Sequence, residues 1–245
     1  MSRIRVTMGR LRGRWIETRP DLPYRPLPAR LREAFFSHAG PTIEACHFMD
    51  GFAGTGLMGI YALSLGASHV VFIEKDPRVA RLLEQNLRRL GLADRTDVRV
   101  GDIQRVLTRP PAVPMDWVFL GPPYDFPTPR LEAVLERLVR YDWTRNDARL
   151  GVQRFKKSPA PRATGWTLYG TLAHGDDVVY LFQRTAESFG SSGIRESGSS
   201  GIRESGSSGG SGSPPSGGRP CGLRPPNRSV REHPDGTGFA ETFHR

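Results

Sequence analysis

The chain has 245 residues, of which 37% are hydrophobic, and its formal net charge is +10. This length suits one domain of ordinary size plus an appendage, and no apolar run reaches the roughly 18 residues that span a bilayer. Cys46 and Cys221 are the only cysteines, which argues against a disulfide framework or a zinc site. We therefore expect a soluble, cytoplasmic monomer that has no metal site and no membrane contact.

The amino-terminal segment is strongly basic. Residues 1–37 contain nine arginines and three acidic residues. Such an excess attracts phosphates through counterion release, although a solvated basic face would have the same composition. We predict that residues 1–40 form a basic arm that binds RNA.

The first predicted strand, at residues 46–50, leads into a glycine-rich loop. Gly54, Gly56 and Gly59 form a G-x-G-x-x-G pattern that opens a predicted helix at residues 55–65. Glycines let the backbone turn sharply and approach a nucleotide beside the positive end of the helix. The pattern alone is weak, but a strand before it and a helix after it favour a nucleotide site.

The second and third predicted strands each end next to an acidic residue. Glu74 ends the strand at residues 69–74, where it can accept hydrogen bonds from both ribose hydroxyls. Asp102 follows the strand at residues 97–100, where it could meet the exocyclic amine of an adenine. The alternative is that both acids are merely helix caps. Between these strands, residues 76–91 read as a helix that Asp76 caps and Gly91 ends.

A Gly-Pro-Pro-Tyr segment follows the fourth predicted strand, at residues 117–120. Amino-methyltransferases carry Asp/Asn-Pro-Pro-Tyr/Phe at this place, because two acceptors must hold the N–H bonds of the amine while the aromatic ring stacks on the base. The segment would be an ordinary loop breaker if it stood alone. After a buried strand it favours methyl transfer over a nicotinamide oxidoreductase, which is the rival use of such a glycine loop. The predicted catalytic residues are Gly121, Pro122, Pro123 and Tyr124.

The remaining elements complete an α/β pattern. A helix is predicted at residues 128–140, a strand at 149–153, and a hairpin from strands at 167–173 and 178–183. Alternation of this kind predicts a mostly parallel sheet with helices on both faces and an antiparallel hairpin at one edge. Residues 186–245 are rich in Gly, Ser and Pro, and repeat Gly-Ile-Arg-Glu-Ser twice, so we predict a disordered tail.

Together these motifs resemble the RsmD family, SAM-dependent methyltransferases that act on the guanine N2 amine of small-subunit ribosomal RNA. The resemblance extends over most of residues 3–184, and it includes the amino-terminal patterns at 9–14 and 25–36. It implies a Rossmann-like class I fold with a seven-stranded sheet at residues 41–185, S-adenosylmethionine (SAM) as cofactor, and ribosomal RNA or the small ribosomal subunit as partner. The implied SAM contacts are Asp50, Phe52, Ala53, Gly54, Thr55, Gly56, Glu74, Lys75, Asp102 and Ile103. The implied RNA contacts are Arg10, Arg12, Arg14, Arg25, Arg30 and Arg32.

The sequence departs from the family pattern at its most important position. Gly121 stands where the family has Asp or Asn, so one side-chain acceptor is missing, and Asp125 is a candidate substitute. Leu27 and Gly51 are milder departures. Two alternatives to an active guanine methyltransferase remain: a catalytically impaired SAM- and RNA-binding protein of the same fold, and an enzyme for another amine, such as a DNA adenine.

Overall fold

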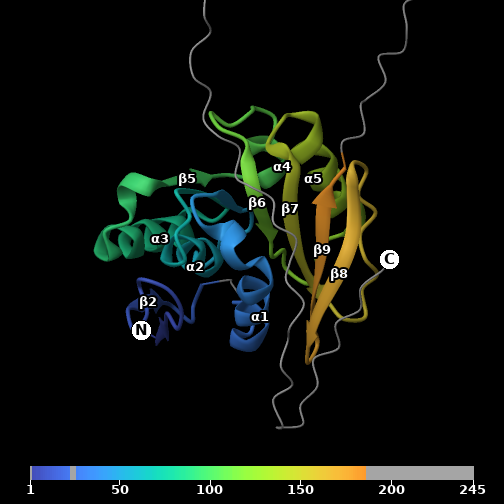
Figure 1. Cartoon of the computed structure of the whole chain (residues 1–245). Helices are drawn as coiled ribbons and strands as arrows, with labels where there is room; N and C mark the ends of the chain where they lie inside the picture. Colours follow the sequence, from blue (N-terminus) through green and yellow to red (C-terminus); the bar gives the residue numbers. More distant parts are fainter. Residues whose placement is uncertain (1, 23–25, 186–245) are drawn as a thin grey trace, which may run out of the picture. The chain divides into compact units, whose positions relative to one another are not determined.

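The computed structural model describes residues 2–22 and 26–185, so the predicted tail and Arg25 lie outside the described residues. A seven-stranded sheet runs through the centre in the order β5-β4-β3-β6-β7-β9-β8 (Figure 1). Its five strands from β5 to β7 are parallel, whereas β9 is antiparallel to β7 and β8 is antiparallel to β9. The predicted sheet and its edge hairpin are confirmed.

The first half of the sheet alternates strands and helices as predicted. The strands are β3 (His47–Asp50), β4 (His69–Glu74) and β5 (Thr96–Val100), and the helices between them are α2 (Leu57–Ser64) and α3 (Pro77–Leu90). Asp76 caps α3 by accepting a hydrogen bond from the backbone N–H of Arg78, and Gly91 ends the helix with φ +70°. The predicted cap and stop signals are both confirmed.

The second half contains longer strands than the sequence predicted. It comprises α4 (Ile103–Val106), β6 (Met115–Leu120), α5 (Thr128–Arg140), β7 (Thr144–Phe155), β8 (Trp166–His174) and β9 (Asp177–Arg184). Helix α5 has the predicted bounds. Strand β7 exceeds the prediction at both ends because its polar residues interrupt the apolar run, although the strand continues through them. The turn between β8 and β9 contains Gly175 with φ +58°, which suits a tight hairpin.

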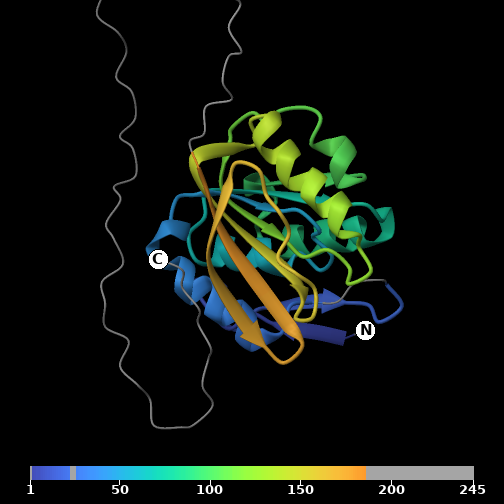
Figure 2. The ribbon, with the colours of Figure 1, turned by 90° about the vertical axis from the view of Figure 1, so that its right-hand side faces the viewer.

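Helices cover both faces of the sheet, each over its own hydrophobic core (Figures 1 and 2). One core joins α1 (Ala29–Ala39), α2 and α3 to the sheet, with Phe35, Phe48 and Tyr61 fully buried in it. The other joins α5 to the sheet around Trp143 and Leu135. Both cores are apolar enough to fix the strands, and therefore the loops at their carboxyl ends, in place.

The amino-terminal segment has regular structure that the sequence did not predict. Strands β1 (Ser2–Arg5) and β2 (Trp15–Thr18) form an antiparallel hairpin, and α1 follows it. The side-chain hydroxyl of Ser64 at the end of α2 accepts a hydrogen bond from Leu11 N–H and donates one to the Met8 carbonyl. The Asn86 side chain on α3 donates to the Glu17 carbonyl and accepts from the Glu17 N–H. The hairpin is thus bonded to two helices of the domain.

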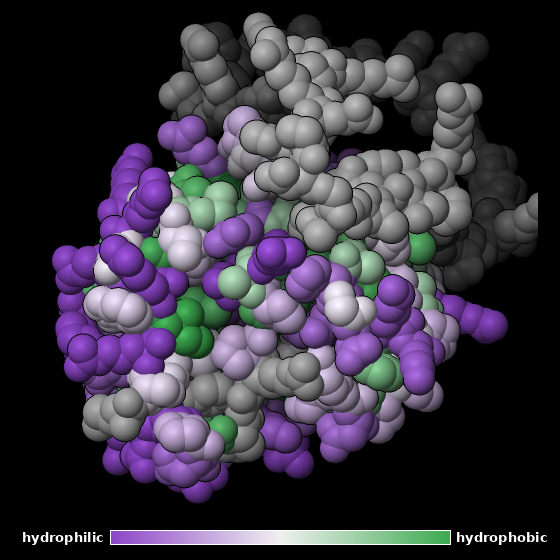
Figure 3. Space-filling model, turned by 90° about the horizontal axis from the view of Figure 1, so that it is seen from below, coloured by the Kyte–Doolittle hydropathy of each residue, from purple (hydrophilic) through white to green (hydrophobic). Residues whose placement is uncertain are grey.

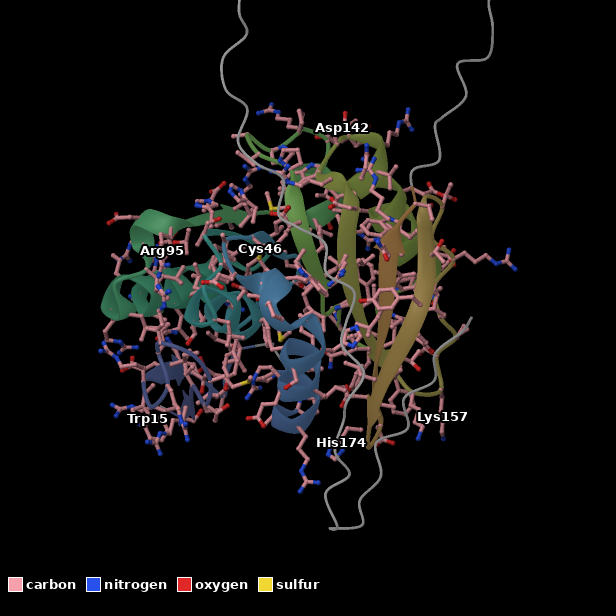
Figure 4. The ribbon with its side chains drawn as sticks, viewed as in Figure 1. Trp15, Cys46, Arg95, Asp142, Lys157 and His174 are labelled. Atoms are coloured by element: carbon pink, nitrogen blue, oxygen red, sulfur yellow. The ribbon has the colours of Figure 1, made fainter. Side chains whose placement is uncertain are left out.

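The surface of this hairpin is polar. Seen from below, the face that carries the hairpin and α1 is mostly hydrophilic, with small apolar groups between (Figure 3). Trp15 is an exception, because 50% of it is exposed, and the Arg5 guanidinium lies 5.8 Å from its ring centroid. Figure 4 shows Trp15 on the outer side of the hairpin. Within residues 2–22 and 26–185, no helix is long and apolar enough to cross a membrane.

Candidate active site

A cavity of about 480 Å³ lies at the carboxyl ends of the parallel strands. Strand ends and the loops after them form its wall, as is usual for ligand sites in open α/β sheets. Nine of the predicted SAM contacts line it: Asp50, Phe52, Ala53, Gly54, Thr55, Glu74, Lys75, Asp102 and Ile103. All four predicted catalytic residues line it as well. The structure thus gathers into one cavity residues that the sequence spreads over 75 positions, from 50 to 124.

Gly56 and Gly59 must each be glycine, but for different structural reasons. Gly56 has φ +73°, and an added Cβ would lie 2.2 Å from the side chain of Leu83, so it faces the core and does not line the cavity. This corrects the expectation that Gly56 itself contacts the cofactor. At Gly59 an added Cβ would lie 2.2 Å from the Phe72 ring, so this glycine allows close packing of α2 on β4.

Glu74 holds the glycine loop from the end of β4. Its carboxylate accepts hydrogen bonds from the backbone N–H groups of Gly54 at 2.8 Å and Asp76 at 2.9 Å. Glu74 is therefore no helix cap, contrary to the alternative raised above. It fixes the position of the loop, and the same side chain lines the cavity where a ribose contact was predicted.

Asp50 is a buried carboxyl at the end of β3. It is only 2% exposed and accepts a hydrogen bond from Gly59 N–H at 3.1 Å. Burial raises its pKa to about 7, the hydrogen bond from Gly59 opposes the increase, and the nearby charge of Glu74 adds to it. Around neutral pH this side chain can therefore exist in either protonation state.

Asp102 does cap a helix, because it accepts a hydrogen bond from Gln104 N–H at the start of α4. Its second oxygen lies 3.3 Å from the guanidinium of Arg130, which comes from α5 and lines the same cavity. Asp102 is partly exposed and keeps access to the cavity. Capping and ligand contact are therefore compatible at this position.

The loop after β6 is held by a buried acid at the start of β9. The Tyr124 hydroxyl donates a 2.5 Å hydrogen bond to Asp177 Oδ1, and Gln153 Nε2 donates a 2.8 Å hydrogen bond to the same oxygen. Asp177 is 2% exposed and begins β9, directly opposite Phe155 at the end of β7. Arg154 adds two further bonds to this loop, to the Phe126 carbonyl and the Thr128 hydroxyl.

The predicted RNA contacts divide into exposed and buried arginines. Arg10, Arg12, Arg14 and Arg30 are exposed. Arg32 is only 3% exposed: it donates a hydrogen bond to the Leu27 carbonyl, and its guanidinium lies 4.6 Å from the centroid of the Tyr61 ring. The expectation that Arg32 contacts RNA is therefore wrong for this conformation, since the side chain fastens α1 to α2.

Sequence reasoning missed Gln153, Asp177 and Arg130. Gln153 ended a predicted strand, and the rule that drew attention to Glu74 and Asp102, a polar residue at the carboxyl end of a parallel strand, applies to it equally. Asp177 was assigned to a turn. Its burial depends on the antiparallel pairing of β7 with β9, which has no local signal. Within the described segments, no cluster of three or more His, Cys, Asp or Glu could hold a metal ion.

Comparison with known proteins places this site in a family. The family model described as conserved hypothetical protein 95 matches residues 4–183. Ribosomal RNA small subunit methyltransferase D of Haemophilus influenzae is 32% identical over 182 residues, which cover 74% of this chain and 93% of that protein. The protein of the same name from Escherichia coli is 30% identical over 188 residues, covering 76% of this chain and 92% of that one. The chain belongs to the RsmD family.

Solved structures agree with this assignment. The structure of yhhF from Escherichia coli is 28% identical and has a TM-score of 0.68, covering 76% of this chain and all of that one. A structure from Haemophilus influenzae is 30% identical, with a TM-score of 0.62 and coverages of 75% and 99%. The RsmD-family fold described here is thus a class I methyltransferase fold, as the sequence predicted.

Proposed function

We propose that the protein transfers a methyl group from SAM to the exocyclic N2 amine of a guanine in small-subunit ribosomal RNA. The observation that carries this proposal is the cavity, which is lined both by the glycine loop with Glu74 and by Pro122, Pro123 and Tyr124. A cofactor site and an amine site must share one cavity in a direct transfer, because the two reacting atoms have to meet in line. The names of the relatives support ribosomal RNA as the substrate.

The residues present suit SAM. The cavity has the volume of a typical small-molecule site, and it combines apolar walls with a few carboxylates. Glu74 would accept the ribose hydroxyls and Asp102 the adenine amine, while residues 52–55 would surround the methionine portion. Bound there, SAM would supply an electrophilic methyl carbon next to the Pro-Pro-Tyr loop.

The chain's own residues would hold and orient the amine. The Tyr124 ring would stack on the guanine, and its hydroxyl is already held by Asp177. In the transfer, the lone pair of the N2 nitrogen forms the new N–C bond, the C–S bond breaks with its electrons on sulfur, and the nitrogen then loses a proton to water. Orientation of the nitrogen supplies most of the catalysis in such a scheme.

The amino-terminal arm supplies charge for the RNA backbone. Arg10, Arg12, Arg14 and Arg30 are exposed, and the hairpin that carries the first three is bonded to α2 and α3. Figure 4 shows Lys157 and His174 at the opposite end of the sheet from Asp142, which precedes β7. That is the end at which β7 stops and the cavity lies, so these basic side chains extend the surface available to RNA.

The alternatives receive less support. The related proteins are named methyltransferases, which favours neither an oxidoreductase nor a catalytically impaired protein. A DNA adenine is supported by amine chemistry alone, whereas the names of both relatives described above specify ribosomal RNA. A cytoplasmic location and a monomeric state remain predictions.

Methyl transfer from labelled SAM to small ribosomal subunits or their RNA tests the proposal. We expect label to appear as N2-methylguanine, and Tyr124→Ala, which removes the ring proposed to stack on the base, to reduce it strongly. Label on adenine, or on DNA in preference to ribosomal RNA, would favour the other amine. Binding of SAM without any transfer to either nucleic acid would establish the impaired protein instead.

A further inference from the structure

Two side chains crowd the place where the Asp or Asn of the family would stand at position 121. A Cβ added to Gly121 would lie 3.2 Å from Gln153 Oε1 and 3.3 Å from the Phe119 ring. Strands β6 and β7 are parallel, with Leu120 opposite Val152. Gly121, the first residue after β6, is therefore a neighbour of Gln153 on β7. The amide oxygen of Gln153 therefore lies in tight contact with the point at which the side chain of a larger residue at 121 would begin.

The orientation of this amide is fixed by charge. Gln153 Nε2 donates to Asp177 Oδ1 at 2.8 Å. An ionised carboxylate can only accept hydrogen bonds, so the nitrogen of the amide must face Asp177 and the oxygen must face away from it. Gln153 is 6% exposed, and the surface it retains lines the cavity beside Gly121 and Tyr124. The result is a fixed hydrogen-bond acceptor at the edge of the amine site.

We propose that Gln153 Oε1 accepts one N–H of the substrate amine and so replaces the side-chain acceptor that Gly121 lacks, with Asp177 as the residue that positions it. This inference rests on the proposed function. Gln153 holds the N–H and does not remove the proton, because a neutral amide oxygen is too weak a base. The second N–H is left to the carbonyl of Pro122, as in the general scheme for this motif.

Asp125, the substitute considered from the sequence, is a weaker candidate. It lines the cavity but is exposed, whereas Gln153 is buried and held by a charged partner. An acceptor that is already oriented stabilises the transition state more than one that must be ordered when the substrate binds. If Gln153 is the acceptor, Gln153→Met should lose activity and Asp125→Ala should keep it. If Asp125 is the acceptor, the reverse should hold.

The test compares Gln153→Met, which keeps the length of the side chain and removes the acceptor, with the wild-type protein. The readouts are kcat and KM for methyl transfer to small subunits, the SAM affinity, and the melting temperature. We expect kcat to fall about a hundredfold to a thousandfold, as for loss of one preorganised hydrogen-bonding group, with SAM affinity unchanged. Gln183→Met is the matched control, because Gln183 is an exposed glutamine on β9 that does not line the cavity.

A second comparison has a readout other than turnover. Once the labelled guanine is located, short RNAs with guanosine or inosine at that position differ only in the N2 amine. Wild-type protein should bind the guanosine RNA more tightly, and Gln153→Met should lose this preference. A fall in kcat with the preference intact would show a purely structural role and overturn the proposal.

A third experiment restores the missing acceptor at position 121 in a variant that lacks Gln153. Gln153→Ala opens the space next to Gly121, so the double variant Gln153→Ala with Gly121→Asn should recover most of the activity lost in Gln153→Ala. Absence of recovery, full activity of Gln153→Met, or loss of activity in Asp125→Ala alone would each overturn the assignment. A wild-type protein that methylates no RNA would instead refute the proposed function, and this inference with it.

Discussion

Tyr124 and Asp177 join two parts of the chain that are 53 residues apart through a 2.5 Å hydrogen bond between the phenol and the carboxylate. Tyr124 belongs to the loop after β6, and Asp177 begins the edge hairpin. The antiparallel hairpin contributes no residue to the lining of the cavity. Through this bond it nevertheless positions the aromatic residue that we propose to stack on the substrate base.

Removal of this phenol hydroxyl should slow methyl transfer more than it weakens the fold. In Tyr124→Phe the ring can still stack on the base, but its hold on Asp177 is lost, and a hydrogen bond to a charged group contributes about 1.5–3 kcal/mol. We expect kcat to fall about tenfold or more, with little change in KM. Tyr180→Phe is the control: it removes a 2.9 Å hydrogen bond to the Ser158 carbonyl, and Tyr180 does not line the cavity. Equal effects of both variants on kcat would contradict this prediction.

Arg32 and Arg30 should separate stability from RNA affinity, although both match the family's amino-terminal pattern. Arg32→Ala removes a buried side chain that bonds Leu27 and covers Tyr61, so the free energy of unfolding should fall by about 2–4 kcal/mol. Arg30→Ala removes an exposed charge and should leave unfolding unchanged, while the affinity for RNA falls and depends less on salt. Denaturant unfolding and filter binding at several salt concentrations measure the two effects. If Arg32→Ala kept full stability and its RNA affinity depended less on salt, Arg32 would be an RNA contact and the assignment made here would be wrong.

Asp50 should make stability depend on pH. Burial raises its pKa from 3.8 to about 7, so the folded protein retains a proton that the unfolded chain has already released. The stability linked to this proton is complete below about pH 4 and is lost as the pH rises to about 7. Asp50→Asn keeps an oxygen for the Gly59 N–H and carries no charge. The melting temperature of Asp50→Asn minus that of the wild type should therefore increase as the pH rises through this range. If the two melting temperatures instead changed in parallel with pH, Asp50 would have an ordinary pKa.

Several features of the fold were predictable because they are local. The cap at Asp76, the stop at Gly91 and the bounds of α5 depend on neighbouring residues, and all were predictable. The gathering of Asp50, Glu74 and the Pro-Pro-Tyr loop was also predictable, because the carboxyl ends of parallel strands meet at one edge.

Other features depend on contacts between distant segments. Strands β1 and β2 are only four residues long and therefore carry little strand signal of their own, and their hairpin is held by Ser64 and Asn86 on two later helices. The role of Arg32 likewise depends on Tyr61, 29 residues away. Composition identified this region as basic, but it could not separate the arginines that face solvent from the one that is buried.

The packing of α2 on β4 can be tested at Gly59, where the third glycine of the loop pattern meets Phe72. In Gly59→Ala the new Cβ would lie 2.2 Å from the Phe72 ring, and overpacking of this kind costs about 1–3 kcal/mol. Phe72→Leu alone should also destabilise the protein, because it leaves a cavity in a fully buried position. The two changes compensate in shape, so the double variant should lose less stability than the sum of the single losses, as measured by denaturant unfolding. Strictly additive losses of stability would mean that α2 and β4 move apart to admit the methyl group. In that case SAM affinity should fall in Gly59→Ala and stay low in the double variant.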